Sequence, residues 1–249
     1  MRPDSSRWLA IALALPLVAL PATRAGATDA ALVDQPARPP SLGLEAAFAV
    51  RGNRVPSAGF DAFSTNDGLT QTTLAVSYRL RRSQMSGLAF GFEWRYGSAS
   101  SHARGTESSL AVQGLAFTVQ GRRTLGKRWL AYGRIAPGAV RAAARLYEPS
   151  GLPSSARAFD TPALTQTKWL PTVDGAAGVA FRMGELSGER TPAFGIWLTG
   201  EGGYGYTPSY ALALAARAAP AAGRTAQPLS LGQLSLSGAF LRFGVALTF

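Results

Sequence analysis

The sequence predicts an all-β fold, a transmembrane antiparallel up-and-down barrel of eight strands. Three observations predict it: apolar residues alternate with small or polar ones, connections are alternately short and long, and the C-terminal segment alternates strictly. Alternation at period two is typical of a strand with two different faces. Beyond residue 27 no uninterrupted apolar run approaches the roughly 20 residues of a membrane helix. A membrane-spanning fold here must therefore be built from strands.

The first 27 residues are typical of a secretory signal peptide. Arg2 precedes the uncharged apolar run 8–22, and small residues at 25–27 follow it. The alternative is an uncleaved membrane anchor, but the run is short and contains prolines. We expect residues 28–41 to form a Pro-rich extended periplasmic lead-in and residues 42–249 to form the barrel.

Composition limits the partners and the chemistry. The chain has no Cys, which excludes disulfides, thiolate metal sites and a lipid-anchored lipoprotein precursor. Without the charges of residues 1–27, the formal net charge is 22 − 13 = +9. An exported basic chain meets anionic lipid headgroups far more than nucleic acid. We therefore expect outer-membrane lipids and lipopolysaccharide as partners, and no nucleic acid.

The predicted strands have one bulky apolar face and one face of small residues interrupted by Arg and Glu. They lie at residues 42–51, 73–80, 88–96, 114–120, 129–135, 173–183, 194–206 and 241–249. In a soluble periplasmic barrel, which is one alternative, the apolar face lines the interior. In a membrane barrel it meets lipid and the polar face lines the interior. In the fifth strand the second arrangement places Trp129 outward and Arg134 inward, which keeps the charge away from lipid.

The connections alternate in length, as in a membrane barrel with short periplasmic turns and long extracellular loops. The short ones are 82–87, 123–128 and 184–192. The long ones are 52–69, 97–109, 137–172 and 207–233. Tyr210, Leu212 and Leu214 continue the parity of the seventh strand, so we expect that strand to extend into its loop. An extra hairpin inside 137–172 would give ten strands instead of eight.

The inward faces contain carboxylates and arginines in similar numbers. Because an eight-stranded barrel is just wide enough for side chains to fill, and a buried carboxylate must be paired, we predict an ion-pair plug rather than an acid–base pair. Its predicted members are Glu45, Glu93, Asp174, Glu201, Arg79, Arg95, Arg134, Arg182 and Arg242. Many inward positions are Gly or Ala, so a narrow pore for small solutes is the alternative.

The C-terminal segment alternates strictly and ends on Phe: its outward residues are Leu241, Phe243, Val245, Leu247 and Phe249. It resembles the C-terminal recognition signal of bacterial outer-membrane barrel proteins. The resemblance implies that periplasmic chaperones and the barrel-assembly machinery recognise these residues. Over residues 42–249 the strand count and loop rhythm are similar to the small eight-stranded outer-membrane proteins, the group with the OmpA transmembrane domain and OmpX. Leu234, Leu236 and Phe240 have the opposite parity, which requires either a bulge near Gly238 or apolar side chains inside.

A catalytic site is not expected. The lone histidine is His102; a resemblance to outer-membrane lipid-modifying enzymes would require a serine two residues after it, where this chain has Arg104. Ser100 and Glu107 lie nearby, but in a predicted loop of small polar residues. A solvated histidine is the preferred interpretation, and one histidine without a second ligand does not predict a metal site. We expect no cofactor, and a lipid-modifying enzyme remains an alternative.

Cationic residues also occur in the predicted long loops. Those placed to contact lipopolysaccharide phosphates by charge-assisted hydrogen bonds are Arg141, Arg145, Arg157, Lys168, Arg217 and Arg224. Together these features predict a non-enzymatic integral protein of the cell outer membrane, exported with a cleaved signal peptide. Its expected role is envelope integrity or surface interaction through the long loops.

Overall fold

The computed structural model describes residues 43–81, 86–103, 106–147, 163–186, 194–216 and 228–249. The strands in these ranges are β1 (Leu44–Arg54), β2 (Gly68–Arg81), β3 (Ser86–Ala103), β4 (Thr106–Thr124), β5 (Trp129–Tyr147), β6 (Ala163–Leu186), β7 (Phe194–Tyr206), β8 (Tyr210–Ala216), β9 (Leu229–Leu234) and β10 (Gly238–Thr248). Within the same ranges, no helix is long and apolar enough to cross a membrane. The expected signal peptide and lead-in, residues 1–27 and 28–41, lie outside the described residues.

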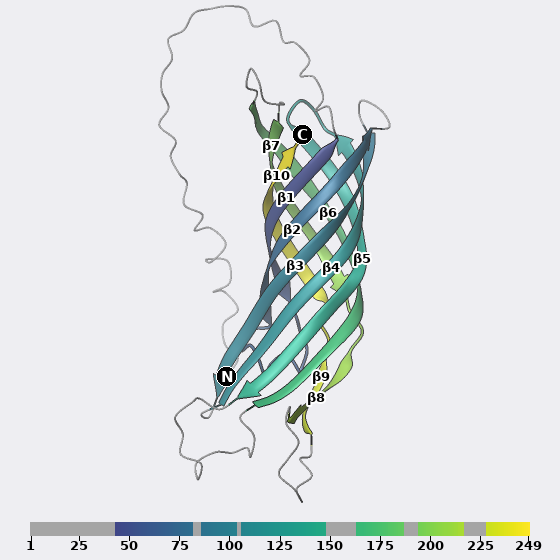
Figure 1. Cartoon of the computed structure of the whole chain (residues 1–249). Coiled ribbons are helices and arrows are strands. Elements are labelled where there is room, and N and C mark those ends of the chain that lie inside the picture. Colours follow the sequence, from purple (N-terminus) through teal and green to yellow (C-terminus); the bar gives the residue numbers. More distant parts are fainter. Residues whose placement is uncertain (1–42, 82–85, 104–105, 148–162, 187–193, 217–227) are drawn as a thin grey trace, which may run out of the picture. The chain divides into compact units, whose positions relative to one another are not determined.

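The strands other than β8 and β9 close into an eight-stranded antiparallel barrel (Figure 1). Around the wall the order is β1 to β7 and then β10, which pairs with β1 from Glu45↔Thr248 to Asn53↔Phe240. Closure pairs the edges that an open sheet would leave free. The prediction of an eight-stranded up-and-down barrel is confirmed. We call the end that carries the 125–128 turn and Phe249 the turn end, and the opposite end the loop end.

The strands continue much further toward the loop end than the sequence predicts. β3 and β4 pair as far as Ala103↔Thr106, and β5 and β6 as far as Tyr147↔Ala163. The prediction of long loops at 97–109 and 137–172 is therefore wrong, because most residues of both segments belong to strands. The described part of 137–172 extends two wall strands and adds none, so the ten-stranded barrel is also wrong.

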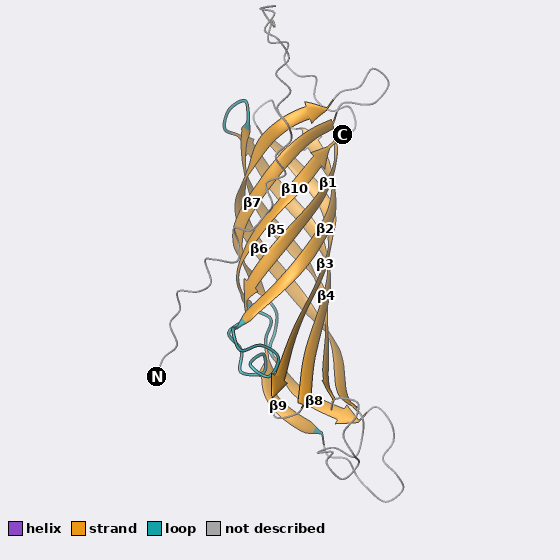
Figure 2. Cartoon of the chain, turned by 90° about the vertical axis from the view of Figure 1, so that its left-hand side faces the viewer, coloured by secondary structure: helices purple, strands orange, loops and turns teal. Residues whose placement is uncertain are grey.

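The β8–β9 hairpin completes the wall at the loop end (Figure 2). β8 pairs with β6 at Leu164↔Ala216 and Thr165↔Ala215. The side-chain amide of Gln166 then bridges the gap between the two strands, donating to Ala211 O (3.3 Å) and accepting from Ala213 N (2.9 Å). On the other side of the hairpin, Gly59 N donates to Gln233 O (2.9 Å). The hairpin thus occupies the wall between β6 and the segment that follows β1.

The break at residues 207–209 reverses which face of the chain points inward. Tyr206 is 58% exposed on β7, whereas Tyr210 on β8 is 6% exposed and Leu212 and Leu214 are fully buried. The prediction that these three continue the outward row of β7 is therefore wrong. The break is held by hydroxyl groups: Thr207 N donates to Ser237 Oγ (2.8 Å), and the same Oγ donates to Thr207 O (2.8 Å).

The opposite parity before the last strand has a direct explanation. Leu234 is fully buried at the end of β9 and Phe240 is 3% exposed on β10, so both point inward, and Leu236 packs partly against the same interior. Pairing of β10 with β7 is continuous from Gly238↔Gly205 onward. Of the two alternatives, apolar side chains inside the barrel is the correct one.

Candidate functional site

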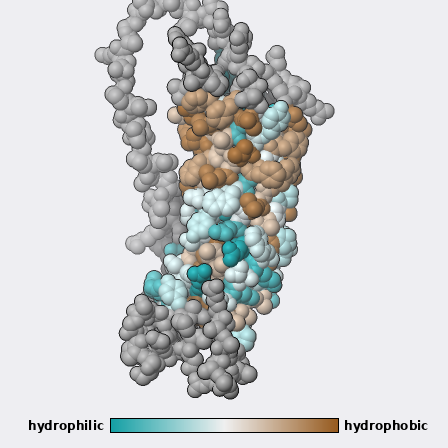
Figure 3. All heavy atoms as spheres, viewed as in Figure 1, coloured by the Kyte–Doolittle hydropathy of each residue, from teal (hydrophilic) through white to brown (hydrophobic). Residues whose placement is uncertain are grey.

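The outer surface at the turn-end half is apolar. Figure 3 shows hydrophobic residues gathered over this half and more hydrophilic residues toward the loop end. Large apolar side chains project outward from most strands, among them Phe92 (70% exposed), Ile135 (60%), Met183 (60%) and Leu241 (61%). A surface of this kind is stable in lipid rather than in water, because it would be costly to hydrate.

The C-terminal residues belong to this outer surface. Leu241, Phe243 and Val245 are exposed and outward, and Leu247 and Phe249 are partly buried at the turn end. The ring of Phe249 lies 6.1 Å from that of Phe194, between centroids. The five residues share one side of the last strand, and their role in assembly stays a prediction.

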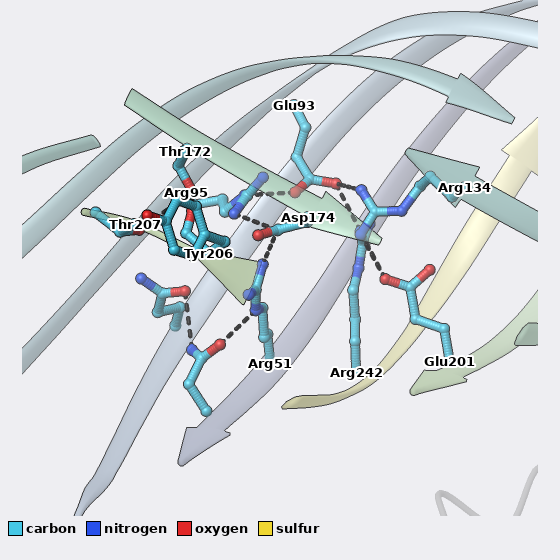
Figure 4. A network of polar contacts seen from close by, with 12 residues as sticks. Arg51, Glu93, Arg95, Arg134, Thr172, Asp174, Glu201, Tyr206, Thr207 and Arg242 are labelled. Carbon is cyan, nitrogen blue, oxygen red and sulfur yellow. Dashed lines mark hydrogen bonds and ion pairs between the residues drawn. The ribbon is translucent and has the colours of Figure 1, made fainter. Parts of the chain in front are cut away.

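The interior contains a cluster of buried charges, which we call the central cluster (Figure 4). Its members are Arg51, Glu93, Arg95, Arg134, Asp174, Glu201 and Arg242. Glu93 is 1% exposed and lies between two outward residues of β3, so the pleat directs it inward. Its carboxylate accepts hydrogen bonds from Arg95, Arg134 and Arg242, each at 2.6 Å.

The other carboxylates of the central cluster share these arginines. Glu201 accepts from Arg134 (2.6 Å) and from Arg242 (3.3 Å). Asp174 pairs with Arg95 (2.6 Å) and with Arg51. The residues come from six strands, so the cluster links the wall across the interior. Such a network is stable in a low-dielectric interior only because each carboxylate has at least two cationic partners.

Arg51 extends the central cluster toward the loop end. Its Nε donates to the side-chain oxygen of Asn53 (2.6 Å), and Asn53 in turn donates to Gln71 (3.0 Å). The guanidinium also lies over the ring of Phe240, 3.7 Å from its centroid. This cation–π contact places a charge at the boundary between the polar and the apolar interior.

A second group of charges, the turn-end cluster, consists of Glu45, Arg79, Gln120 and Arg122. Arg122 donates to both carboxylate oxygens of Glu45, at 2.6 and 2.7 Å, and Arg79 donates to one of them at 2.8 Å. Arg122 also donates to Gln120 (2.9 Å). The bidentate geometry gives the Arg122–Glu45 pair both strength and a fixed orientation.

The structure brings most of the predicted plug residues together. Eight of the nine lie in the two clusters; the ninth, Arg182, lies near the turn end of β6, just before the register shift at Gly184. The prediction missed Arg51 and Arg122, although each has the inward parity of its strand. Arg122 lies between the predicted end of its strand at residue 120 and the short connection at 123–128, and a strand boundary two residues later includes it.

The interior changes character toward the loop end. There it is apolar, and the loop-end core consists of Val55, Phe60, Phe63, Leu69, Leu110, Val112, Val140, Ala142, Ala144, Leu164, Leu170, Tyr210, Leu212, Leu214 and Leu234. Phe60 and Phe63 come from residues 55–67, which we call the capping loop, and both are fully buried. The prediction that the polar face lines the interior is therefore wrong at the loop end. At the loop end the wall has the polarity of a water-soluble barrel, apolar inside and polar outside.

Small cavities lie beside the charged clusters inside the described barrel. One of about 30 Å³ lies beside Arg51, Arg95 and Asp174, and another, of about 60 Å³, lies between the central and turn-end clusters. Cavities of this size and polarity hold a few water molecules or a small ion.

The residues around the lone histidine lie on the outer face near the loop end. His102 Nε2 contacts a carboxylate oxygen of Glu107, which is its cross-strand partner, and Ser100 is paired with Ser109. The pKa of the Glu107 carboxyl is lowered, first because it accepts a hydrogen bond from Tyr147 and second because of His102. The His102 side chain is 70% exposed. The arrangement is a surface network that ties three strands together.

The cationic residues predicted to meet lipopolysaccharide divide into two groups. Arg141 and Arg145 are exposed on the outer face of β5, and Lys168 is exposed on β6 with its ammonium 5.2 Å from the ring centroid of Tyr210. Arg157, Arg217 and Arg224 lie outside the described residues. Within those residues, no group of three or more His, Cys, Asp or Glu side chains could hold a metal ion.

Comparison with known proteins yields structural similarity but no sequence family. No family model matches the chain, and no curated protein matches it. Among solved structures it is similar to Neisserial surface protein A, with 12% identity, a TM-score of 0.47, and coverage of 83% of this chain and 97% of that one. It is also similar to the attachment invasion locus protein of Yersinia pestis, with 11% identity, a TM-score of 0.40 and coverage of 83% and 97%. The outer membrane protease OmpT of Escherichia coli has 10% identity, a TM-score of 0.42 and coverage of 84% and 94%. The topology of the present chain, eight next-neighbour antiparallel strands in a closed wall, is that of the small eight-stranded outer-membrane barrels.

Proposed function

We propose that this protein is a non-enzymatic integral protein of a bacterial outer membrane, with a closed interior and a rigid wall that projects beyond the lipid. The observation that carries the proposal is the reversal of polarity along the barrel. The turn-end half is apolar outside and charged inside, and the loop end is polar outside and apolar inside. Lipid favours the first arrangement and water the second.

The dimensions of the apolar band support this placement. On β3 the large outward residues run from Leu88 to Tyr96, which is about 26 Å of strand at roughly 3.3 Å per residue. Aromatic residues lie near both ends of the band: Trp129 packs on Phe181 at the turn end, and Trp94 stacks on Tyr96 toward the loop end. Aromatic girdles at the two interfaces are typical of outer-membrane barrels.

A pair of arginine substitutions on one face of β3 tests the placement. Phe92 is 70% exposed in the middle of the apolar band, and Ser98 is exposed on the same face toward the loop end. Phe92→Arg is expected to lower the free energy of unfolding by about 2–4 kcal/mol, and Ser98→Arg by about 0–1 kcal/mol. The measurement is urea unfolding of protein refolded into lipid vesicles, followed by tryptophan fluorescence. Equal losses for the two variants would contradict a membrane boundary between these positions.

Interaction with lipopolysaccharide is the surface role that we propose. Arg141 and Arg145 project from the outer face of β5 beyond the apolar band, and Trp169 on the neighbouring strand lies opposite Arg141. Guanidinium groups at this height are placed to donate to lipid phosphates. We also propose that the C-terminal row ending at Phe249 is the recognition segment for periplasmic chaperones and the barrel-assembly machinery.

Replacing both arginines of β5 by alanine tests the surface role. Arg141→Ala with Arg145→Ala is expected to weaken binding of lipopolysaccharide to the purified protein and to make cells more sensitive to detergent. Arg123→Ala is the matched control, because Arg123 is also exposed but lies at the turn end. Unchanged binding in the double variant, or an equal loss in the control, would contradict the proposal.

The proposal includes the absence of an enzymatic activity. The hydrogen bonds of the buried carboxylates support this part. Glu45, Glu93 and Glu201 each accept hydrogen bonds from two or more arginines. A carboxylate engaged in this way is stabilised as the anion and is a poor general acid. Comparison of lipid A by mass spectrometry, with and without the protein, tests this part: a modified lipid A would contradict it.

A further inference from the structure

The charges of the two clusters do not balance. The two clusters contain six arginines and four carboxylates, 6 − 4 = +2. The arginines are Arg51, Arg79, Arg95, Arg122, Arg134 and Arg242, and the carboxylates are Glu45, Glu93, Asp174 and Glu201. Arginine stays protonated under all ordinary conditions, so this excess cannot be removed by loss of a proton. A buried charge without a partner is strongly unfavourable.

Part of the excess surrounds the larger cavity. Its charged lining includes Arg79, Arg122, Arg134 and Arg242. Against these stand Glu45, Glu93 and Glu201, so the lining has a net charge of 4 − 3 = +1. Arg122 and Arg134 are 8% and 6% exposed, so solvent does little to screen them.

The guanidinium groups around this cavity also have unused hydrogen-bonding capacity. Within the described part of the chain, the buried Nε atoms of Arg79, Arg122 and Arg134 have no hydrogen-bond partner. The neutral lining supplies further donors, among them the hydroxyl groups of Ser77 and Thr118. A volume of about 60 Å³ accommodates one small anion together with water.

We propose that the cavity between the central and turn-end clusters is a binding site for a small monovalent anion of chloride size. The anion cancels the net charge of the lining. It acts as one more negative charge beside the four carboxylates of the two clusters. It enters from the turn end, where Arg79 and Glu45 remain partly exposed with 24% and 14% of their side-chain surfaces.

The direct test uses bromide as the probe. Crystals of the full chain grown in sodium bromide are expected to show an anomalous peak in the cavity, within about 4 Å of the guanidinium of Arg122 or Arg134. Ser77→Asp provides a built-in carboxylate at the cavity wall and is expected to abolish the peak while the barrel stays folded. Gln113→Glu is the matched control, since it adds the same charge on the outer face of β4 and is expected to leave the peak unchanged.

A solution measurement separates binding from crystal effects. The temperature at which the folded form is lost on gels is expected to fall by about 2–4 °C when chloride is replaced by gluconate, which is too large for the cavity. Ser77→Asp is expected to remove this dependence, and Arg122→Gln, which also neutralises the lining, to do the same. A wild-type cavity without bromide, or a peak and an anion dependence that persist in both variants, would overturn the proposal.

Discussion

Glu93 is the residue on which the interior network depends most. It is 1% exposed and accepts hydrogen bonds from Arg95, Arg134 and Arg242 at 2.6 Å each. These arginines keep a second carboxylate, since Arg95 also pairs with Asp174 and the other two with Glu201. Without Glu93, each of these arginines therefore keeps one carboxylate partner and loses the other.

Glu93→Gln keeps the size of the side chain and removes its charge. Because buried cations then lose a shared anion, the free energy of unfolding is expected to fall by about 3–5 kcal/mol. Urea unfolding in lipid vesicles measures it, with Glu107→Gln as the control, since Glu107 lies in the surface network at the loop end. A loss below about 1 kcal/mol for Glu93→Gln would mean that the network contributes little to stability.

The faces of the strands at the turn-end half follow from the sequence because side chains in a strand alternate with a period of two. Once Phe92 and Trp94 are outward, Glu93 and Arg95 must be inward. The loop end could not be predicted in this way. In β4 the alternation of Leu110 and Val112 with small and polar neighbours is as regular as in the lipid-facing segments, but the apolar face there points inward.

Alternation alone does not say which face meets water. The position at which the apolar face turns from outward to inward depends on how far the strand projects from the lipid. The same limit explains β8. Whether Tyr210 points in or out depends on the break at residues 207–209, whose hydroxyl contacts come from Ser235 and Ser237 on a distant part of the chain.

The β8–β9 hairpin is expected to depend on its buried leucines rather than on backbone pairing. Within the described residues it shares two residue pairs with β6, whereas Leu212 and Leu214 are fully buried in the loop-end core. Leu212→Ala is expected to lower the stability of the hairpin by about 2–5 kcal/mol, because it removes buried methyl groups and leaves a cavity. Hydrogen exchange measures this as faster exchange in β8 and β9.

Leu125→Ala is the control for this variant, since Leu125 is 59% exposed in the turn between β4 and β5. It is expected to leave exchange in β8 and β9 as it is in the wild type. Equal exchange in Leu212→Ala and the wild type would show instead that the hairpin is held by the Gln166 bridge and its contacts with the capping loop.

For the whole molecule, the two kinds of interior act as barriers in series. Ions crossing from the turn end must pass the central cluster, and then the loop-end core, where Phe60 and Phe63 of the capping loop are fully buried. A conducting path requires both barriers to be open, because apolar constrictions exclude ions even where the rest of the lumen is polar. The wild type is therefore expected to show no steady openings in planar bilayers, and Glu93→Ala alone to show none either.

Combining Glu93→Ala with Phe60→Ala and Phe63→Ala removes the shared carboxylate and the two rings that fill the loop end. This triple variant is expected to produce steady openings, since water can then enter from both ends and meet in the middle. The variant with only the two phenylalanine changes is expected to stay silent, because the central cluster still crosses the lumen. Steady conductance in the wild type or in either partial variant would contradict the model of two barriers and favour a narrow pore.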